Sequence, residues 1–231
     1  MAAVRDNSVE AFSASAATTL ETATFAVGGS NRVLYVFVAT GAGTPVDPSA
    51  VKWGGSGGTS LAQISTTLNV SANGKFSVWR LIAPTAQTST VHVTWGSSQD
   101  ERLIIAVSVK DADQTTPNGT VATATGTSAS PSVAAASVSG DYVLSGGFWL
   151  DDAGSSRTVA VDASETSIQE IEGADVVFEG MWASEETAAG TSTTMSATIS
   201  GSEEWGMFAF AVNGAAAGGT ILRQMMNYEG A

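Results

Sequence analysis

The sequence contains no cysteine and only one histidine among its 231 residues. The missing cysteines exclude disulfide bonds, thiol catalysis and cysteine-ligated zinc. The single histidine, His92, lies within the alternating run Thr90–Trp95, out of phase with Val91 and Val93. We therefore expect it to be a surface or packing residue. No stretch approaches the roughly 18 apolar residues that a membrane helix needs, and we expect no membrane partner.

Basic residues are scarce as well. Nine Lys and Arg residues face 22 Asp and Glu residues, which gives a net charge of −13. This charge repels a phosphate backbone and disfavours anionic membrane surfaces, so we expect no nucleic-acid partner. It favours solubility, and it could attract a basic partner. The first ten residues carry Arg5, Asp6, Asn7 and Glu10 with no apolar run, so we expect no secretory signal peptide there.

Catalytic motifs are also missing. The sequence has no P-loop, no dinucleotide fingerprint and no Gly-x-Ser-x-Gly elbow before a helical pattern. The glycine cluster Gly54–Gly58 lacks the lysine and the following helix of a phosphate-binding loop, and it predicts a turn instead. These absences favour a non-catalytic chain without a cofactor.

Acidic residues occur as neighbours in sequence, at Asp151-Asp152, Glu185-Glu186 and Glu203-Glu204. Glycoside hydrolysis needs two acids held apart across a cleft, which neighbours in a loop rarely provide. Asp111-Ala112-Asp113 and Asp151-Asp152 offer oxygen ligands of the kind calcium prefers, but they match no loop with fixed ligand positions. We therefore expect solvated turn acids, no catalytic residues and no metal site.

What the sequence does contain is short, β-branched and aromatic runs separated by Gly, Pro, Ser and Thr clusters. Such runs suit a pleated, half-buried surface, and they predict an all-β chain. Val33–Val38 is a continuous apolar run, which predicts a strand covered on both faces. Phe76–Ile82 and Val91–Trp95 alternate with the period of two that is typical of strands.

The second half of the sequence repeats the pattern of the first. Ser89–Gly96 corresponds to Thr193–Gly201, and an acidic pair follows each segment, at Asp100-Glu101 and Glu203-Glu204. An apolar run then follows in both halves, at Leu103–Val109 and Trp205–Val212. We predict an antiparallel, jelly-roll-like β-sandwich from two similar halves, at about 31–112 and 141–213, because neither half alone would cover its apolar face.

The sandwich is predicted to span residues 13–213, between an irregular N-terminal arm at 1–12 and a flexible C-terminal arm at 214–231. Residues 114–131 fit either a linker or a weak edge strand. In the C-terminal arm, apolar residues fall at helical spacing. This pattern fits two equal alternatives, a short segment that docks on a neighbouring subunit and a disordered tail. The candidate partner-binding residues are Ile221, Leu222, Met225, Met226 and Tyr228.

The six tryptophans lie in or beside predicted strands. Core packing is the expected role of Trp79, Trp149 and Trp182, because their neighbours are apolar. Trp53 and Trp95 adjoin glycine-rich or polar turns, so they are the better candidates for exposure. An exposed indole face would suit stacking against a sugar ring, which makes these two residues candidate carbohydrate-binding residues.

Six short segments follow one another in a recognisable order: Asn31–Leu34, Val51–Gly55, Leu61, Trp79–Pro84, Val91–Thr94 and Asp113–Pro117. Together they resemble concanavalin-like jelly-roll domains of bacterial secreted proteins and phage virion proteins. The resemblance covers about residues 31–213 and lies in structural motifs, with no ligand or active-site residue to carry over.

The resemblance and the missing chemistry together predict a phage virion component that decorates the capsid or forms part of a fibre. Its expected partners are the major capsid protein or other virion subunits. The chain itself is expected to form a homo-oligomer, which we predict to be a trimer. The alternative is an extracellular carbohydrate-binding module or a receptor-binding fibre domain that recognises surface glycans.

Overall fold

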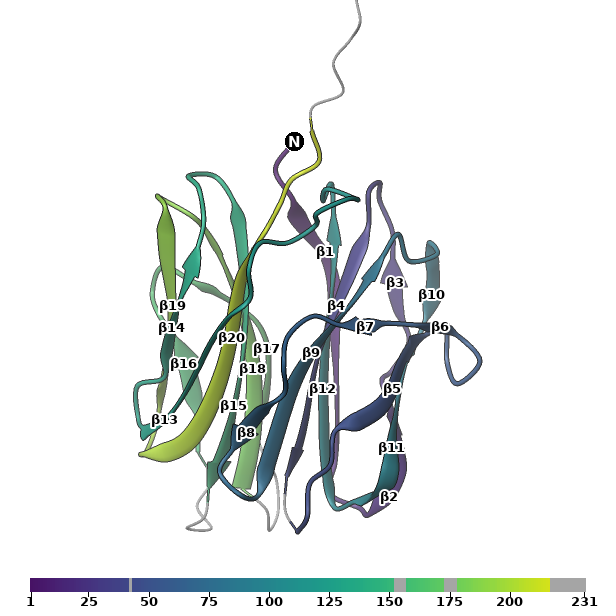
Figure 1. Cartoon of the computed structure of the whole chain (residues 1–231), viewed down its shortest axis with the longest axis vertical. Helices are drawn as coiled ribbons and strands as arrows, with labels where there is room; N and C mark the ends of the chain where they lie inside the picture. The colour runs from purple at the N-terminus through teal and green to yellow at the C-terminus, as the bar shows by residue number, and fades with distance from the viewer. Residues whose placement is uncertain (42, 152–156, 173–177, 217–231) are drawn as a thin grey trace, which may run out of the picture.

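The protein is an all-β sandwich in which antiparallel sheets lie in four layers, as the computed structural model shows (Figure 1). The structure describes residues 1–41, 43–151, 157–172 and 178–216. Within these residues, no helix is long and apolar enough to cross a membrane. The predicted all-β fold class is confirmed, and the C-terminal segment that contains Ile221 to Tyr228 lies outside the described residues.

The first half of the chain forms two layers. Its inner sheet has the order β1-β12-β4-β9-β7, with β8 also paired to β9. These strands are β1 (Val4–Ser13), β4 (Val33–Gly41), β7 (Ala62–Gln63), β8 (Leu68–Val70), β9 (Gly74–Ile82) and β12 (Glu101–Lys110). The outer sheet has the order β2-β11-β5-β6, and β3 pairs with β10. These strands are β2 (Ala17–Glu21), β3 (Phe25–Val27), β5 (Pro48–Trp53), β6 (Thr59–Ser60), β10 (Gln87–Ser89) and β11 (Val91–Gln99).

The second half forms the other two layers. Its inner sheet has the order β13-β20-β15-β18-β17, and its outer sheet has the order β14-β19-β16. The inner strands are β13 (Ala122–Ser128), β15 (Tyr142–Asp151), β17 (Thr166–Glu172), β18 (Phe178–Thr187) and β20 (Glu203–Val212). The outer strands are β14 (Ser132–Ala136), β16 (Val159–Val161) and β19 (Ser192–Ile199).

The two halves share one chain path. In both inner sheets the last strand of the half, β12 or β20, lies between the first strand, β1 or β13, and a central strand, β4 or β15. In both outer sheets the strand just before the last, β11 or β19, is the central one. The repeated unit therefore begins at β1 and at β13, upstream of the boundaries that the sequence pattern indicates.

The predicted irregular arm at residues 1–12 is wrong over most of its length. Residues Val4–Ser13 form β1, which pairs with β12 from Val4↔Lys110 to Ser13↔Arg102. Asp6 is an extra residue in this ladder, and the register shifts between Arg5 and Asn7. An edge strand exposes one side to solvent and tolerates polar residues, which is why its pattern is weak. Between the halves, the segment 114–131 contains the edge strand β13, which is one of the two alternatives predicted there.

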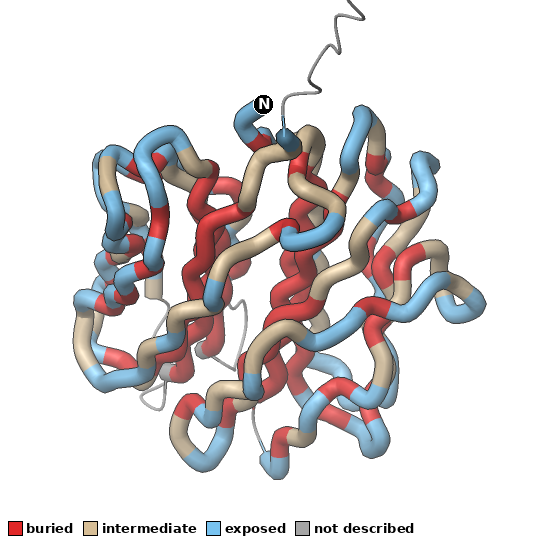
Figure 2. The backbone as a smooth tube through the Cα atoms, turned by 45° about the horizontal axis from the view of Figure 1, so that its top comes forward, coloured by how far each residue is buried: buried red, intermediate tan, exposed pale blue. Residues whose placement is uncertain are grey.

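Three hydrophobic cores fill the spaces between the four layers. The central core lies between the two inner sheets, and an outer core lies between each inner sheet and its own outer sheet. Aromatic rings of both halves meet in the central core, where the Phe76 and Phe208 ring centroids are 4.9 Å apart. Strand β4 is buried along its whole length, as predicted for the run Val33–Val38, and buried residues concentrate in the inner strands (Figure 2).

Two tryptophans of the second half lie over glycines of the neighbouring strand. In the ladder between β15 and β18, Gly147 pairs with Trp182 and Trp149 pairs with Gly180. A Cβ atom at Gly147 would lie 2.1 Å from the Trp182 ring, and one at Gly180 would lie 1.9 Å from the Trp149 ring. The two rings contact each other at a centroid distance of 5.8 Å. Glycine is therefore required at both positions because the indole occupies the space of a side chain.

Substitution of Gly147 by alanine is expected to lower the free energy of unfolding by about 1–3 kcal/mol, because the added methyl group must displace the Trp182 ring in a packed core. Urea unfolding followed by tryptophan fluorescence measures this loss. Gly190→Ala is the matched control, since nothing lies within 4 Å of a Cβ atom there. Equal stabilities of the two variants would contradict the packing described.

Candidate functional site

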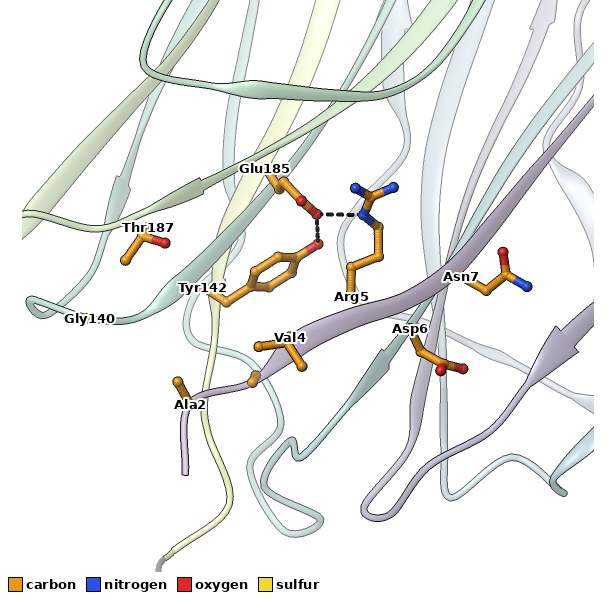
Figure 3. A pocket seen from close by; sticks show the side chains of 10 residues that line it. Ala2, Val4, Arg5, Asp6, Asn7, Gly140, Tyr142, Glu185 and Thr187 are labelled. Carbon is orange, nitrogen blue, oxygen red and sulfur yellow. Dashed lines mark hydrogen bonds and ion pairs between the residues drawn. The ribbon is translucent and has the colours of Figure 1, made fainter.

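A hollow lies between the two halves, at the end of the molecule that holds Met1 (Figure 3). It has a volume of about 540 Å³ and is open to solvent. One wall is the segment from Ala2 to Asn7, which leads into β1 and forms its start. The other wall is formed by Gly140 of the β14–β15 connection, Tyr142 at the start of β15, and Glu185 and Thr187 of β18. The groove thus forms where the edge of one inner sheet meets the other inner sheet.

Three side chains form a polar cluster in this groove. The Tyr142 hydroxyl donates to Oε2 of Glu185 at 2.7 Å, and Nε of Arg5 forms an ion pair with the same oxygen at 2.9 Å. Arg5 comes from the first half, while Tyr142 and Glu185 come from the second. The cluster therefore joins the halves across the groove, and Figure 3 shows both bonds converging on Glu185.

The environment of Tyr142 suppresses its ionisation. Burial raises the pKa of the Tyr142 hydroxyl well above its usual value, and the negative charge of Glu185 raises the pKa further. The positive charge of Arg5 acts in the opposite direction. The hydroxyl is consequently a fixed hydrogen-bond donor rather than a proton-transfer group at neutral pH.

Asp6 and Asn7 also lie along the groove, but their side chains are used elsewhere. Oδ2 of Asp6 accepts hydrogen bonds from the Gly28 amide at 2.8 Å and from the Ser108 hydroxyl at 3.1 Å. The Asn7 side chain donates to the Ala26 carbonyl at 3.2 Å. These bonds hold β1 on the first half, so Arg5 is the residue of this stretch that reaches the second half.

A smaller hollow of about 270 Å³ continues from the groove along the second half. It shares Tyr142, Glu185 and Thr187 with the groove and adds Ser164 and Thr166. The joined surface is polar and acidic, and it offers hydroxyl and carboxylate groups to a ligand or a partner.

Exposed apolar side chains gather at this same end. In the part of the chain that the structure describes, the exposed large hydrophobic residues are Met1 at 65%, Val4 at 41% and Val138 at 60%. Val4 lines the groove, and Val138 lies in the β14–β15 connection together with Gly140, which also lines it. The last described residues lie at this end as well, because the Met1 amino group donates to the carbonyl of Ala215 at 2.6 Å.

The predicted exposure of Trp53 and Trp95 is wrong. Each is only 2% exposed, and both belong to the outer core of the first half. Trp53 packs edge-on against Phe25 at a centroid distance of 5.1 Å, and its Nε1 donates to the Thr85 carbonyl. The glycine-rich turn beside Trp53 is exposed only in part, while the indole follows Val51 inward. Neither ring offers a face for sugar stacking.

The acidic neighbours singled out in the sequence divide into different environments. Glu203 forms an ion pair with Arg157 at 2.6 Å, and Glu185 belongs to the groove cluster. Asp113 accepts hydrogen bonds from the Thr116 and Thr115 amides, which lower the pKa of its carboxyl. Among the described residues, no group of three or more His, Asp or Glu side chains could hold a metal ion. Asp152 lies outside those residues.

His92 lies on β11 with its Nδ1 atom 3.6 Å from Oε2 of Glu21 on the neighbouring strand β2. Its side chain is 15% exposed, so it packs at the surface of the outer sheet. Of the groove cluster, the sequence singled out Glu185, in the acidic pair Glu185-Glu186, and Arg5, in the N-terminal segment 1–12. It did not single out Tyr142, and no pattern placed the three residues together. No known protein family, curated protein or solved structure matches this chain.

The titration of Tyr142 tests the groove geometry. Glu185→Gln is expected to lower the Tyr142 pKa while leaving it above the usual value, because burial is the larger cause and remains. Arg5→Gln is expected to raise the same pKa, because a favourable cation is lost. Tyrosine-selective ¹³C NMR against pH measures both shifts in the folded protein. Shifts of the same sign in the two variants would contradict the cluster.

Proposed function

We propose that this chain is a non-catalytic structural subunit of a larger assembly, specifically a phage virion component that decorates a capsid or forms part of a fibre. The observation that carries the proposal is the gathering of Met1, Val4 and Val138 at the end that also holds the groove. Exposed apolar side chains that cluster beside a polar groove are typical of protein contact surfaces.

The packing of the molecule supports a structural role. Three cores hold four layers together, and strands β4 and β12 are buried on both faces over almost their entire length. The six indole rings, which could otherwise offer a binding platform, are all at most 9% exposed. Most apolar side chains are thus packed inside the molecule, and the exposed ones that could contact partners lie at the groove end.

The proposed partners are the major capsid protein, other virion subunits and further copies of this chain. The net charge of −13 favours a partner whose contacting surface is basic. The groove supplies complementary chemistry, because Glu185 and its neighbours are acidic while Arg5 provides one cation. The described part of the chain ends at residue 216, and a C-terminal segment follows it in the sequence. We propose that this segment docks on a neighbouring subunit through Ile221, Leu222, Met225, Met226 and Tyr228.

The carbohydrate-binding alternative loses the residues on which it was based. Sugar stacking needs an accessible aromatic face, and Trp53 and Trp95 are enclosed in the outer core. We therefore propose no second function for these positions.

Self-association of the intact chain tests the proposal. Native mass spectrometry across a concentration series is expected to show an oligomer, and the double substitution Val4→Asp with Val138→Asp is expected to weaken it at least about tenfold, which corresponds to about 1.4 kcal/mol. The substitutions place charge on the apolar end while leaving the cores untouched. Ser130→Asp, in the exposed turn at the opposite end, is the control and should leave the oligomer unchanged.

Two results would count against this proposal. One is a chain that remains monomeric up to its solubility limit. The other is an oligomer that Ser130→Asp weakens as much as the double substitution does, since contacts would then not be confined to the end that carries the groove.

A further inference from the structure

Two buried glutamates meet between the halves at the end opposite the groove. Glu101 begins β12 and Glu179 lies near the start of β18. Along β12, Glu101 follows the alternation of Leu103 and Ile105, which face the central core. Along β18, Glu179 follows the alternation of Met181 and Ala183 in the same way. Both carboxyl groups therefore point into the space between the two inner sheets.

The Glu179 side chain crosses from the second half onto the first. Glu101 pairs with Gly41 in the ladder between β12 and β4. A Cβ atom at Gly41 would lie 1.4 Å from Oε1 of Glu179, so the carboxyl group fills the space that any larger residue would need. Glu101 is 0% exposed and Glu179 is 3% exposed, which removes both groups from water.

No donor among the described residues compensates the buried carboxyl group of Glu101. Within the part of the chain that the structure describes, neither of its oxygens accepts a hydrogen bond from an N–H or O–H group. Its polar neighbour is the carboxyl group of Glu179, whose Oε1 lies over Gly41, the ladder partner of Glu101. This places the two carboxyl groups side by side, so that a hydrogen bond between them can form once a proton is present. An ionised carboxylate only accepts hydrogen bonds, so a bond between two carboxyl groups requires that one of them holds a proton.

Among the described residues, the charged side chains near Glu101 do not neutralise its carboxyl group. Asp100 adds a further negative charge from the turn before β12. Arg102 faces the opposite side of the sheet, where it donates to Ser13. Lys75, near the start of β9, is bonded to the Asn69 side chain. The side chain of Asp151 lies outside the described residues, and the sequence has no Lys, Arg or His at 152–156 or 173–177.

Burial raises the pKa of Glu101 above its ordinary value, and the charge of Asp100 raises it further, while the bond to Glu179 has the opposite effect. The geometry and this direction agree, because an uncompensated buried carboxylate is far more costly than a carboxylic acid. Two close carboxyl groups in one dry site commonly hold a single proton between them.

We propose that Glu101 and Glu179 share one proton at neutral pH and act as a pH-sensitive clasp between the two halves. Loss of this proton leaves two adjacent carboxylates in the dry interface, and their repulsion separates the sheets at this end. The clasp does not depend on what the groove binds at the other end, so it stands apart from the proposed function.

The direction of the pH effect follows from proton binding. The folded chain binds this proton more tightly than the unfolded chain, in which Glu101 has its ordinary pKa of 4.5. The stabilisation is therefore complete below that value and is lost as the pH rises through the raised pKa. A difference of one bound proton changes the unfolding equilibrium constant by up to about tenfold per pH unit in this range.

Urea unfolding of the intact chain between about pH 5 and about pH 9, where the ordinary carboxyl groups are already ionised, tests the clasp. The wild-type chain is expected to lose stability steeply as the pH rises. Glu101→Gln is expected to flatten this dependence, because an amide can donate to Glu179 at every pH. Glu204→Gln is the matched control, since Glu204 lies at the start of the corresponding strand β20 and lines an open groove. It should leave the pH dependence unchanged.

A second measurement does not depend on the folding of a variant. Carboxyl ¹³C NMR of the wild-type chain is expected to show one glutamate that stays protonated at neutral pH. A spectrum in which every glutamate titrates near its ordinary pKa would overturn the proposal, as would identical pH profiles of the wild-type chain and Glu101→Gln. Recovery of the high-pH stability by added Ca²⁺, seen in the wild-type chain and lost in Glu101→Gln, would also overturn it, because the pair would then hold a cation instead.

Discussion

The face-to-face packing of the two inner sheets is the contact on which the rest of the structure depends. Each half covers the outer face of its inner sheet with its own outer sheet, but only the other half covers the inner face. Aromatic rings from both halves interlock there, as in the contact between Tyr35 and Phe210 at 4.9 Å. Separation of the halves would expose this core to water, so the repeat is an obligate pair within one chain.

Strand β18 shows how the chain closes this core at both ends. Its inward row begins with Glu179, continues with Met181 and Ala183, and ends with Glu185. At the groove end, Arg5 and Tyr142 satisfy the carboxylate of Glu185. At the other end a neighbour of Glu179 is the carboxyl group of Glu101. The groove end is thus held by the ion pair of Arg5 and Glu185, and it is the end that we propose for contacts with partners. The opposite end is the one at which we propose a shared proton.

Periodicity predicted the parts of this structure that local pattern determines. The strand at Val33–Val38 faces the central core on one side and the outer core of the first half on the other, so both faces need apolar residues. The continuous apolar run in the sequence predicted this burial. Trp53 was misjudged because its glycine neighbours indicated exposure, whereas its period-two partner Val51 indicated burial. Glu101 could have been placed by its phase with Leu103, although the repeat pattern identified it only as part of the acidic pair Asp100-Glu101 before the apolar run. The Arg5–Glu185 pair joins residues 180 positions apart, and no local pattern encodes such a meeting.

Hydrogen exchange of the native chain in low urea tests most directly whether the halves are one cooperative unit. If the central core unites them, the slowest amides of β4 and β12 and those of β15 and β20 should exchange through one global opening. Their free energies of opening and their urea dependences would then be equal. Two groups of amides, divided by half and opening with different free energies, would contradict the shared core as the basis of the fold.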